Sequence, residues 1–125
     1  MPNVNEAVVT YLAAWNEPDP ERRRGLIART WTENGGYVDA HRNGEGHAAL
    51  DSMIAAAQGM FPGYRLRLVS KIEAHGQRAR FGWVAGGVPD APLYRAGTDF
   101  VTLAPDGRFE SVTGFIDAAP APVGA

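Results

Sequence analysis

The sequence contains no cysteine. Disulfide bonds, thiolate nucleophiles and cysteine-ligated metals are therefore excluded. It also lacks any apolar run near the ~20 residues that a membrane-spanning helix needs. Residues 1–6 lack the basic region and the apolar run of a secretion signal. These absences fit a cytoplasmic protein that does not associate with a membrane.

An excess of either charge is missing too. The sequence has 12 lysines and arginines and 14 aspartates and glutamates, a formal net charge of -2. This balance argues against nucleic acid or an anionic membrane as the main partner. The one basic run, residues 22–24, follows Asp19 and Glu21. We interpret it as a solvated helix face.

Enough apolar side chains are present for one core. Hydrophobic residues make up 45% of the 125 positions and charged residues 21%, which is the composition of an ordinary soluble domain. We assign residues 1–117 to a single domain. Residues 118–125 are rich in alanine and proline, and we expect them to form a flexible tail.

Three segments have the apolar period of a helix. The first spans residues 3–16, where Asn3 and Glu6 have capping-box spacing. A short second helix follows, with Asp19 as N-cap and Pro20 at its first position. The third spans residues 47–58. The side chains expected to face the core are Val4, Val8, Tyr11, Leu12, Trp15, Leu26, Ile27, Trp31, Leu50, Met53, Ile54 and Ala57.

The strands are predicted from alternation and from turn residues. A turn at residues 34–36 precedes a short strand at 37–40, in which Tyr37 and Asp39 share one face. A polar loop is expected at 41–46. Four antiparallel strands are expected at 64–74, 78–86, 93–103 and 108–116, joined by connections at 75–77, 87–92 and 105–107. Segregated helices and strands indicate an α+β fold, with a hollow between the helices and a curved sheet.

Several short motifs recur in a fixed order along the chain. They are residues 11–16, 37–39, 46–50, 80–83, 97–100, 106–109 and 114–117. Together they resemble the nuclear transport factor 2-like class, which includes the SnoaL-like polyketide cyclases and the ketosteroid isomerases. The resemblance implies a cystatin-like α+β barrel. In it a cone-shaped, curved antiparallel or mixed sheet wraps around three N-terminal helices, and homodimers through the outer sheet face are frequent.

The resemblance to ketosteroid isomerase concerns three positions. Asp39 resembles the base, and Tyr11 and Asp99 resemble the pair that holds the enolate oxygen. His41 is a candidate second acid or base, as in dehydratases of the class. The residues also allow other interpretations. Asp39 could cap the following loop, Asp99 could make a structural bond to an arginine such as Arg95, Tyr11 could be a core tyrosine and His41 an exposed loop residue.

A charged side chain within an apolar strand is unusual unless it is paired or functional, which draws attention to Asp99. The ligand is expected to be an apolar or aromatic small molecule. No glycine-rich loop precedes a helix to hold phosphate, and the histidines lack metal-ligand spacing, so we expect no cofactor and no metal. The expected ligand contacts are Trp15, Tyr37, Met53, Phe61, Phe81, Trp83, Val101 and Phe115.

Two hypotheses for function follow from this. The first is a cofactor-independent isomerase, cyclase or dehydratase, in which Asp39 takes a proton beside a carbonyl group while Tyr11 and Asp99 stabilise the enolate. The second is a non-catalytic module of the same fold that binds a ligand or assembles as a dimer.

Overall fold

Three helices and seven strands follow one another in the computed structural model, which describes residues 3–86 and 93–117. The predicted loop at 87–92 and tail at 118–125 lie outside the described residues. The elements are α1 (Val4–Asn16), α2 (Pro20–Thr30), β1 (Trp31–Val38), β2 (Asn43–Glu45), α3 (His47–Met60), β3 (Arg65–Leu68), β4 (Glu73–His75), β5 (Arg78–Gly86), β6 (Leu93–Leu103) and β7 (Phe109–Ile116).

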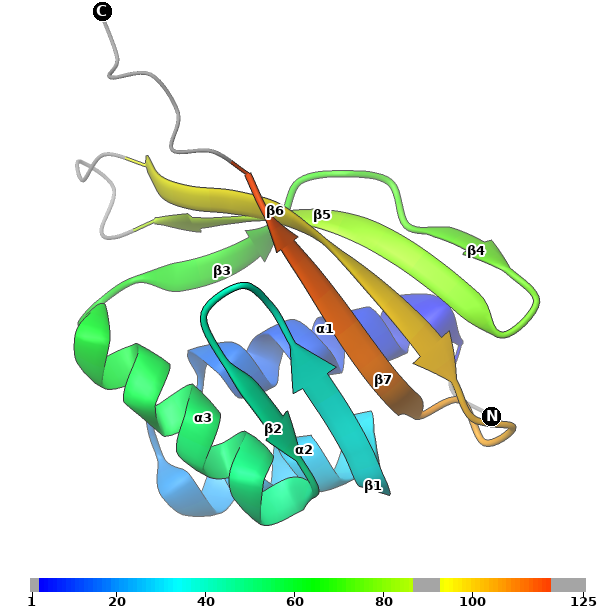
Figure 1. Cartoon of the computed structure of the whole chain (residues 1–125), viewed down its shortest axis with the longest axis horizontal. Coiled ribbons are helices and arrows are strands. Elements are labelled where there is room, and N and C mark those ends of the chain that lie inside the picture. The colour runs from blue at the N-terminus through cyan, green and yellow to red at the C-terminus, as the bar shows by residue number, and fades with distance from the viewer. Residues whose placement is uncertain (1–2, 87–92, 118–125) are drawn as a thin grey trace, which may run out of the picture.

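The strands form one mixed sheet in the order β2-β1-β7-β6-β5-β3, and β4 also pairs with β5. Strands β1 and β7 run parallel, whereas the other pairs are antiparallel. Helix α1 runs along the inner side of this curved sheet, and α3 lies beside β2 and β1 (Figure 1). The predicted α+β architecture is confirmed.

The helix boundaries follow from local capping. The Asn3 side chain accepts a hydrogen bond from the Glu6 backbone N–H at 2.8 Å and caps α1. Asp19 likewise accepts from the Arg22 backbone N–H at 2.9 Å and caps α2, which begins at Pro20. Both N-caps were predicted from sequence, because a short polar side chain can satisfy an otherwise unpaired N–H of the first turn.

The turn expected at residues 34–36 is wrong, because Asn34, Gly35 and Gly36 lie inside β1. The glycines instead allow the Trp31 ring to approach the backbone closely. A Cβ on Gly35 would lie 2.7 Å from the Trp31 ring, and the Trp31 indole N–H donates to the Gly36 carbonyl at 3.1 Å. The pairing with β7 shifts register between Trp31 and Gly36. The two glycines therefore mark an irregularity in the strand. Glycine is favoured both at such irregularities and in turns.

Two further expectations about the strands need correction. Residues 43–45 form β2, although the whole segment 41–46 was expected to be a loop. Residues 64–74 form two short strands, β3 and β4, and not one. Between them the Ser70 hydroxyl accepts from the Gly82 backbone N–H at 2.6 Å. A side-chain bond thus replaces part of the backbone ladder there.

The basic run at residues 22–24 is not uniformly solvated. Arg23 is buried, with 4% of its surface exposed. Its Nε lies 2.6 Å from Asp51 of α3, and its Nη1 donates to the Gln58 side chain and the Glu17 carbonyl. A buried charge persists only when it is paired. The side-chain partners Asp51 and Gln58 come from α3, so they could not be identified from the residues around Arg23.

The core lies between α1 and the inner face of the sheet, and Tyr11 is at its centre. The Tyr11 ring packs against Trp31, Phe81 and Phe109 with ring centroids 5.4 to 5.6 Å apart. The residues predicted to face inward on α3, namely Leu50, Met53, Ile54 and Ala57, are all buried. The outer face of the sheet retains exposed apolar side chains, which are Val38, Phe100 and Phe115.

Candidate functional site

A cavity of about 360 Å³ lies between the helices and the inner face of the sheet. Helices α1 and α3 supply one wall, and β1, β3, β5, β6 and β7 supply the other. The volume lies within the range of about 300–1,000 Å³ that is typical of small-molecule sites. The cavity is lined by Tyr11, Trp15, Tyr37, Asp39, His41, Arg42, Ala57, Gln58, Met60, Phe61, Tyr64, Leu66, Trp83, Ala85, Arg95, Asp99 and Ile116.

Asp99 is the buried carboxyl of this cavity, with 1% of its surface exposed. The Tyr11 hydroxyl donates to its Oδ2 at 2.6 Å, and the Trp83 indole N–H donates to its Oδ1 at 3.0 Å. Helix α1, β5 and β6 thus each contribute one member of a hydrogen-bonded trio. Trp83 can reach the carboxyl because Gly97 leaves room for its ring, which a Cβ there would meet at 2.6 Å.

Asp39 is the second carboxyl, and it follows the end of β1. The Tyr37 hydroxyl donates to its Oδ2 at 2.6 Å, and the backbone N–H groups of His41 and Arg42 donate to its Oδ1 at 2.7 and 2.9 Å. The Arg42 guanidinium lies 3.5 Å from Oδ2. Donors on both oxygens match an ionised carboxylate, which accepts hydrogen bonds only. The same bonds hold the turn between β1 and β2.

The two carboxyl groups meet at Gly114 of β7. A Cβ on Gly114 would lie 2.8 Å from the Tyr37 hydroxyl, 3.0 Å from Asp99 Oδ1 and 3.3 Å from Asp39 Cβ. Both Tyr–Asp pairs therefore converge on one point of the sheet, where glycine alone leaves the space. Gly114 pairs with Asp99 in the β6–β7 register, so the backbone ladder itself fixes this convergence.

Burial gives these groups unusual protonation behaviour. Desolvation is the main cause that raises the pKa of Asp99 from 3.8 to about 6, and the nearby charge of Asp39 adds to it, although the bonds from Tyr11 and Trp83 work in the opposite direction. Burial, followed by the charge of Asp99, also raises the pKa of Tyr11 and that of Tyr37 well above the ordinary value of a phenol. Both phenols are therefore hydrogen-bond donors across the physiological pH range.

Trp15 differs from the other polar side chains of the cavity. Its indole Nε1 is buried and has no hydrogen-bond partner, and it is the only such side-chain atom among the described residues. An unsatisfied buried donor costs about 1–3 kcal/mol. The N–H faces the polar end of the cavity, because its approach to the Tyr11 hydroxyl contributes a small lowering of the pKa of that phenol, although the two groups do not reach the geometry of a hydrogen bond.

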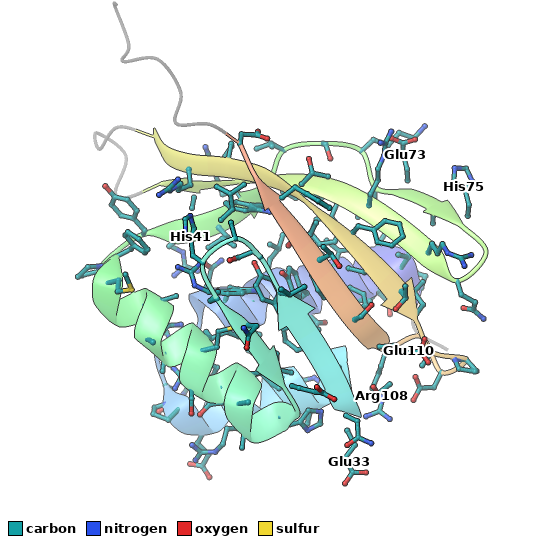
Figure 2. All side chains as sticks on the ribbon, in the orientation of Figure 1. Glu33, His41, Glu73, His75, Arg108 and Glu110 are labelled. Carbon is teal, nitrogen blue, oxygen red and sulfur yellow. The ribbon has the colours of Figure 1, made fainter. Side chains whose placement is uncertain are left out.

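The structure brings together eight of the residues selected from sequence. Tyr11, Asp39, Asp99 and His41 all line the cavity, as do Trp15, Tyr37, Phe61 and Trp83. His41 lies at the tip of the β1–β2 connection (Figure 2).

Four residues expected to contact ligand lie outside the cavity: Met53, Phe81, Val101 and Phe115. Met53, Phe81 and Val101 are buried in the core. Phe115 lies on the outer face of the sheet with 61% of its surface exposed. Alternation along a strand separates two faces, but it does not say how far along the strand the cavity extends.

Several lining residues were not selected from sequence, although some had a signal. Gln58 lies four residues after Ile54 on the inward stripe of α3, and Arg95 lies on the Asp99 face of β6. Arg42 follows Asp39 by three residues, a spacing that is typical of a turn closed by an aspartate side chain. Met60 and Tyr64 flank Phe61, which was selected. The Phe61 and Tyr64 rings stack with centroids 6.3 Å apart.

The described residues contain no group of three or more histidine, aspartate or glutamate side chains that could hold a metal ion. In the same part of the chain, every helix is too short or too polar to cross a bilayer. The polar groups that line the cavity are phenols, indoles, carboxyls, guanidinium groups, the Gln58 amide and the His41 imidazole.

Solved structures provide the comparison with known proteins. A SnoaL-like family protein from Agrobacterium tumefaciens, described provisionally as an isomerase, is 46% identical, with a TM-score of 0.84 over 90% of this chain and 95% of that one. A protein from Jannaschia sp. CCS1, described provisionally as a SnoaL-like polyketide cyclase, is 18% identical, with a TM-score of 0.68 over 89% of this chain and 85% of that one.

A nuclear transport factor 2-like protein of unknown function from Exiguobacterium sp. 255-15 has a TM-score of 0.72 at 15% identity, over 90% of this chain and 99% of that one. At such identity the likeness shows the fold alone. No protein-family model and no curated protein matches the chain. The similarity to the Agrobacterium protein establishes the family, because nearly half of the aligned residues are identical over almost the full length of both chains. The chain belongs to the SnoaL-like family.

Proposed function

We propose that the protein is a cofactor-independent enzyme that moves a proton on an apolar carbonyl compound, as an isomerase, cyclase or dehydratase does. One observation carries the proposal: two buried carboxyl groups with different partners converge at Gly114 on a single cavity, Asp39 beside backbone N–H groups and Arg42, and Asp99 beside a phenol and an indole. When neighbouring carboxyls differ in this way, one can accept a proton while the other supplies one. The cavity therefore has the parts of an acid/base pair.

Asp39 is the proton acceptor in this proposal. Its Oδ1 takes two backbone N–H bonds, which fix the orientation of the carboxylate. Its Oδ2 takes the Tyr37 hydroxyl and lies 3.5 Å from the Arg42 guanidinium. This oxygen would take a proton from the carbon beside a carbonyl group, and the C–H electron pair would move onto the carbonyl oxygen to form an enolate.

Asp99 and Tyr11 stabilise that enolate. The raised pKa of Asp99, about 6, lets the carboxyl hold a proton under mildly acidic conditions, and a neutral carboxyl can donate a hydrogen bond to an oxyanion. Tyr11 is bonded to Asp99 at 2.6 Å, so the two donors lie side by side. His41 lines the same cavity. It is the candidate second acid, which would give a proton to another carbon of the enolate while the proton on Asp39 passes to solvent.

The ligand class follows from the rest of the lining. The apolar side chains of the lining that make no bond to the carboxyls are Leu66, Ala85, Phe61 and Met60. Such a wall favours an apolar or aromatic body over a phosphorylated one. We therefore infer a small apolar molecule whose carbonyl group lies at the buried, polar end.

A substrate-independent assay tests the proposal. Isomerases, cyclases and dehydratases of this kind share the removal of a proton beside a carbonyl, so we use 2-tetralone, a bicyclic ketone, in D₂O buffer. We expect the protein to accelerate the exchange of the ketone's α-protons for deuterium, followed by proton NMR. Asp39→Asn should lower the protein-dependent rate at least tenfold. Glu110→Gln, an exposed carboxyl on β7, should leave it unchanged.

The pH dependence of this rate separates the roles of the two carboxyls. If protonated Asp99 supports the enolate, the protein-dependent rate should fall as pH rises through about 6, because the pKa of Asp99 lies there. A rate that rises through pH 6 would make Asp99 the proton acceptor. Wild-type protein without any acceleration of exchange would defeat the proposal.

The second candidate is a ligand-binding module without catalysis. It is favoured by one observation: groups of the protein itself donate hydrogen bonds to both oxygens of Asp39 and of Asp99. Carboxyls satisfied in this way can serve structure alone. Binding of 2-tetralone without deuterium exchange would support this candidate.

A further inference from the structure

The indole nitrogen of Trp15 has no hydrogen-bond partner, whereas the donors around it in the cavity are bonded to acceptors. The hydroxyls of Tyr11 and Tyr37 donate to Asp99 and Asp39, and the Trp83 indole donates to Asp99. The Gln58 amide donates to two backbone carbonyls. Trp15 Nε1 is the exception, and 94% of the surface of its residue is buried. The buried end of the cavity thus has one donor without an acceptor.

The position of the Trp15 ring places this donor beside both phenols. Trp15 follows Tyr11 by one turn of α1, and the two ring centroids are 6.4 Å apart. The Trp15 and Tyr37 rings meet edge to face with centroids 5.3 Å apart. The indole thus lies between the two Tyr–Asp pairs, at the end of the cavity that holds both carboxyls.

We infer that the Trp15 indole N–H donates a hydrogen bond to an oxygen atom of the ligand. This rests on the proposed function in one respect, namely that the cavity takes a carbonyl compound. The inference narrows the ligand class: the molecule carries a carbonyl, enol or phenol oxygen at its buried end, and a pure hydrocarbon does not satisfy the site. The Tyr11 hydroxyl is bonded to Asp99, so the Trp15 N–H is the donor at this end of the cavity that such an oxygen can meet without breaking a hydrogen bond of the protein.

Indole NMR tests the inference directly, because the three tryptophans act as reporters in one spectrum. The probes are 2-naphthol, which has an oxygen on an apolar bicycle, and 2-methylnaphthalene, which has nearly the same shape without it. We expect 2-naphthol to shift the Trp15 indole proton downfield, and 2-methylnaphthalene to leave its hydrogen bonding unchanged. Trp31 donates to Gly36 outside the cavity, so its signal should stay in place with both probes.

The variant Trp15→Phe identifies the signal and gives a second measurement. It retains an aromatic ring but removes the N–H group. Affinity for 2-naphthol should fall roughly three- to tenfold, as for the loss of one hydrogen bond. Affinity for 2-methylnaphthalene should change by less than about twofold. If the variant fails to fold, the wild-type spectrum alone still decides.

Three outcomes would overturn the inference: a Trp15 signal that stays in place with 2-naphthol, equal shifts with both probes, or equal losses of affinity for both probes in Trp15→Phe. Failure of the proposed function is seen separately. A downfield Trp15 shift without deuterium exchange of 2-tetralone defeats the catalytic proposal and supports the donor. Deuterium exchange of 2-tetralone with an unmoved Trp15 signal would support the catalytic proposal and defeat the donor role of Trp15.

Discussion

At the scale of single residues, Asp39 and Asp99 show how two side chains of the same type acquire different hydrogen-bonding environments. Asp39 follows a strand end, where two backbone N–H groups point at one oxygen. Asp99 lies within β6, where its donors are a phenol and an indole from other elements. The backbone N–H donors of Asp39 are positioned by the turn itself, whereas the donors of Asp99 are positioned only when the whole core has formed. The first environment is therefore local and the second is tertiary.

The raised pKa of Asp99 makes stability depend on pH in a direction that can be measured. The folded state binds a proton more readily than the unfolded state, because its pKa is about 6 and the ordinary value is 3.8. Wild-type stability should therefore fall as pH rises from about 4 to 6 and stay lower above that, by roughly 3 kcal/mol at most. In Asp99→Asn this fall should be absent.

Urea unfolding of both proteins between pH 4 and 7 checks this expectation. Asp106→Asn is the control, because Asp106 is an exposed carboxyl whose pKa is lowered by the backbone N–H and side chain of Arg108. That control should retain the fall seen in the wild type. Parallel curves for Asp99→Asn and wild type would show that Asp99 does not titrate as its burial indicates.

At the scale of elements, glycines in strands decide how closely side chains can gather. Gly97 makes room for the Trp83 ring, Gly114 for the two Tyr–Asp pairs and Gly35 for the Trp31 ring. Each removes a Cβ from the inner side of a curved sheet, where space is smallest. The site therefore depends on residues that themselves have no functional group.

Gly114→Ala tests this dependence. The new Cβ would lie 2.8 Å from the Tyr37 hydroxyl and 3.0 Å from Asp99 Oδ1, so these groups must move apart. We expect a loss of about 1–3 kcal/mol in the free energy of unfolding and a lower rate of 2-tetralone exchange. Gly86→Ala is the matched control, since a Cβ there meets nothing within 4 Å. Equal stability of the two variants would contradict the argument.

The elements also show what sequence can and cannot predict. Alternation identified β5 with its four inward side chains, since the pattern depends on local burial alone. Gly35 and Gly36 were misassigned to a turn, because turns and strand irregularities favour the same residue. The environment of Arg23 was missed, since its partner Asp51 is 28 residues away. For the same reason, the indole donor of Asp99 could not be read from the chain.

At the scale of the whole molecule, the outer face of the sheet carries apolar side chains that the chain itself does not cover. Thr113 pairs with both Val38 and Phe100, so these exposed side chains lie in one row across β1, β7 and β6. Phe115 lies two residues further along β7. Adjacent exposed apolar side chains of this kind favour association. We propose that two copies of the chain meet on this face.

Phe115→Glu tests the proposed dimer. Because Phe115 has 61% of its surface exposed, the change leaves the core intact and places a charge in the proposed interface. We expect the wild type to be a dimer and the variant a monomer by light scattering at equal concentration. Val9→Glu on α1, at an equally exposed position (64%), should remain a dimer. A monomeric wild type would refute the proposal.

The parallel pairing of β1 with β7 also sets an order of events during synthesis. Trp31 to Val38 must wait for Phe109 to Thr113, which leave the ribosome more than 70 residues later. Until then Tyr37 and Asp39 have been made, but Gly114, which both side chains approach, has not. Contacts this distant in sequence form slowly. The pocket is therefore among the last parts of the molecule to be completed, and a nascent chain halted before β7 exposes its binding residues without a site.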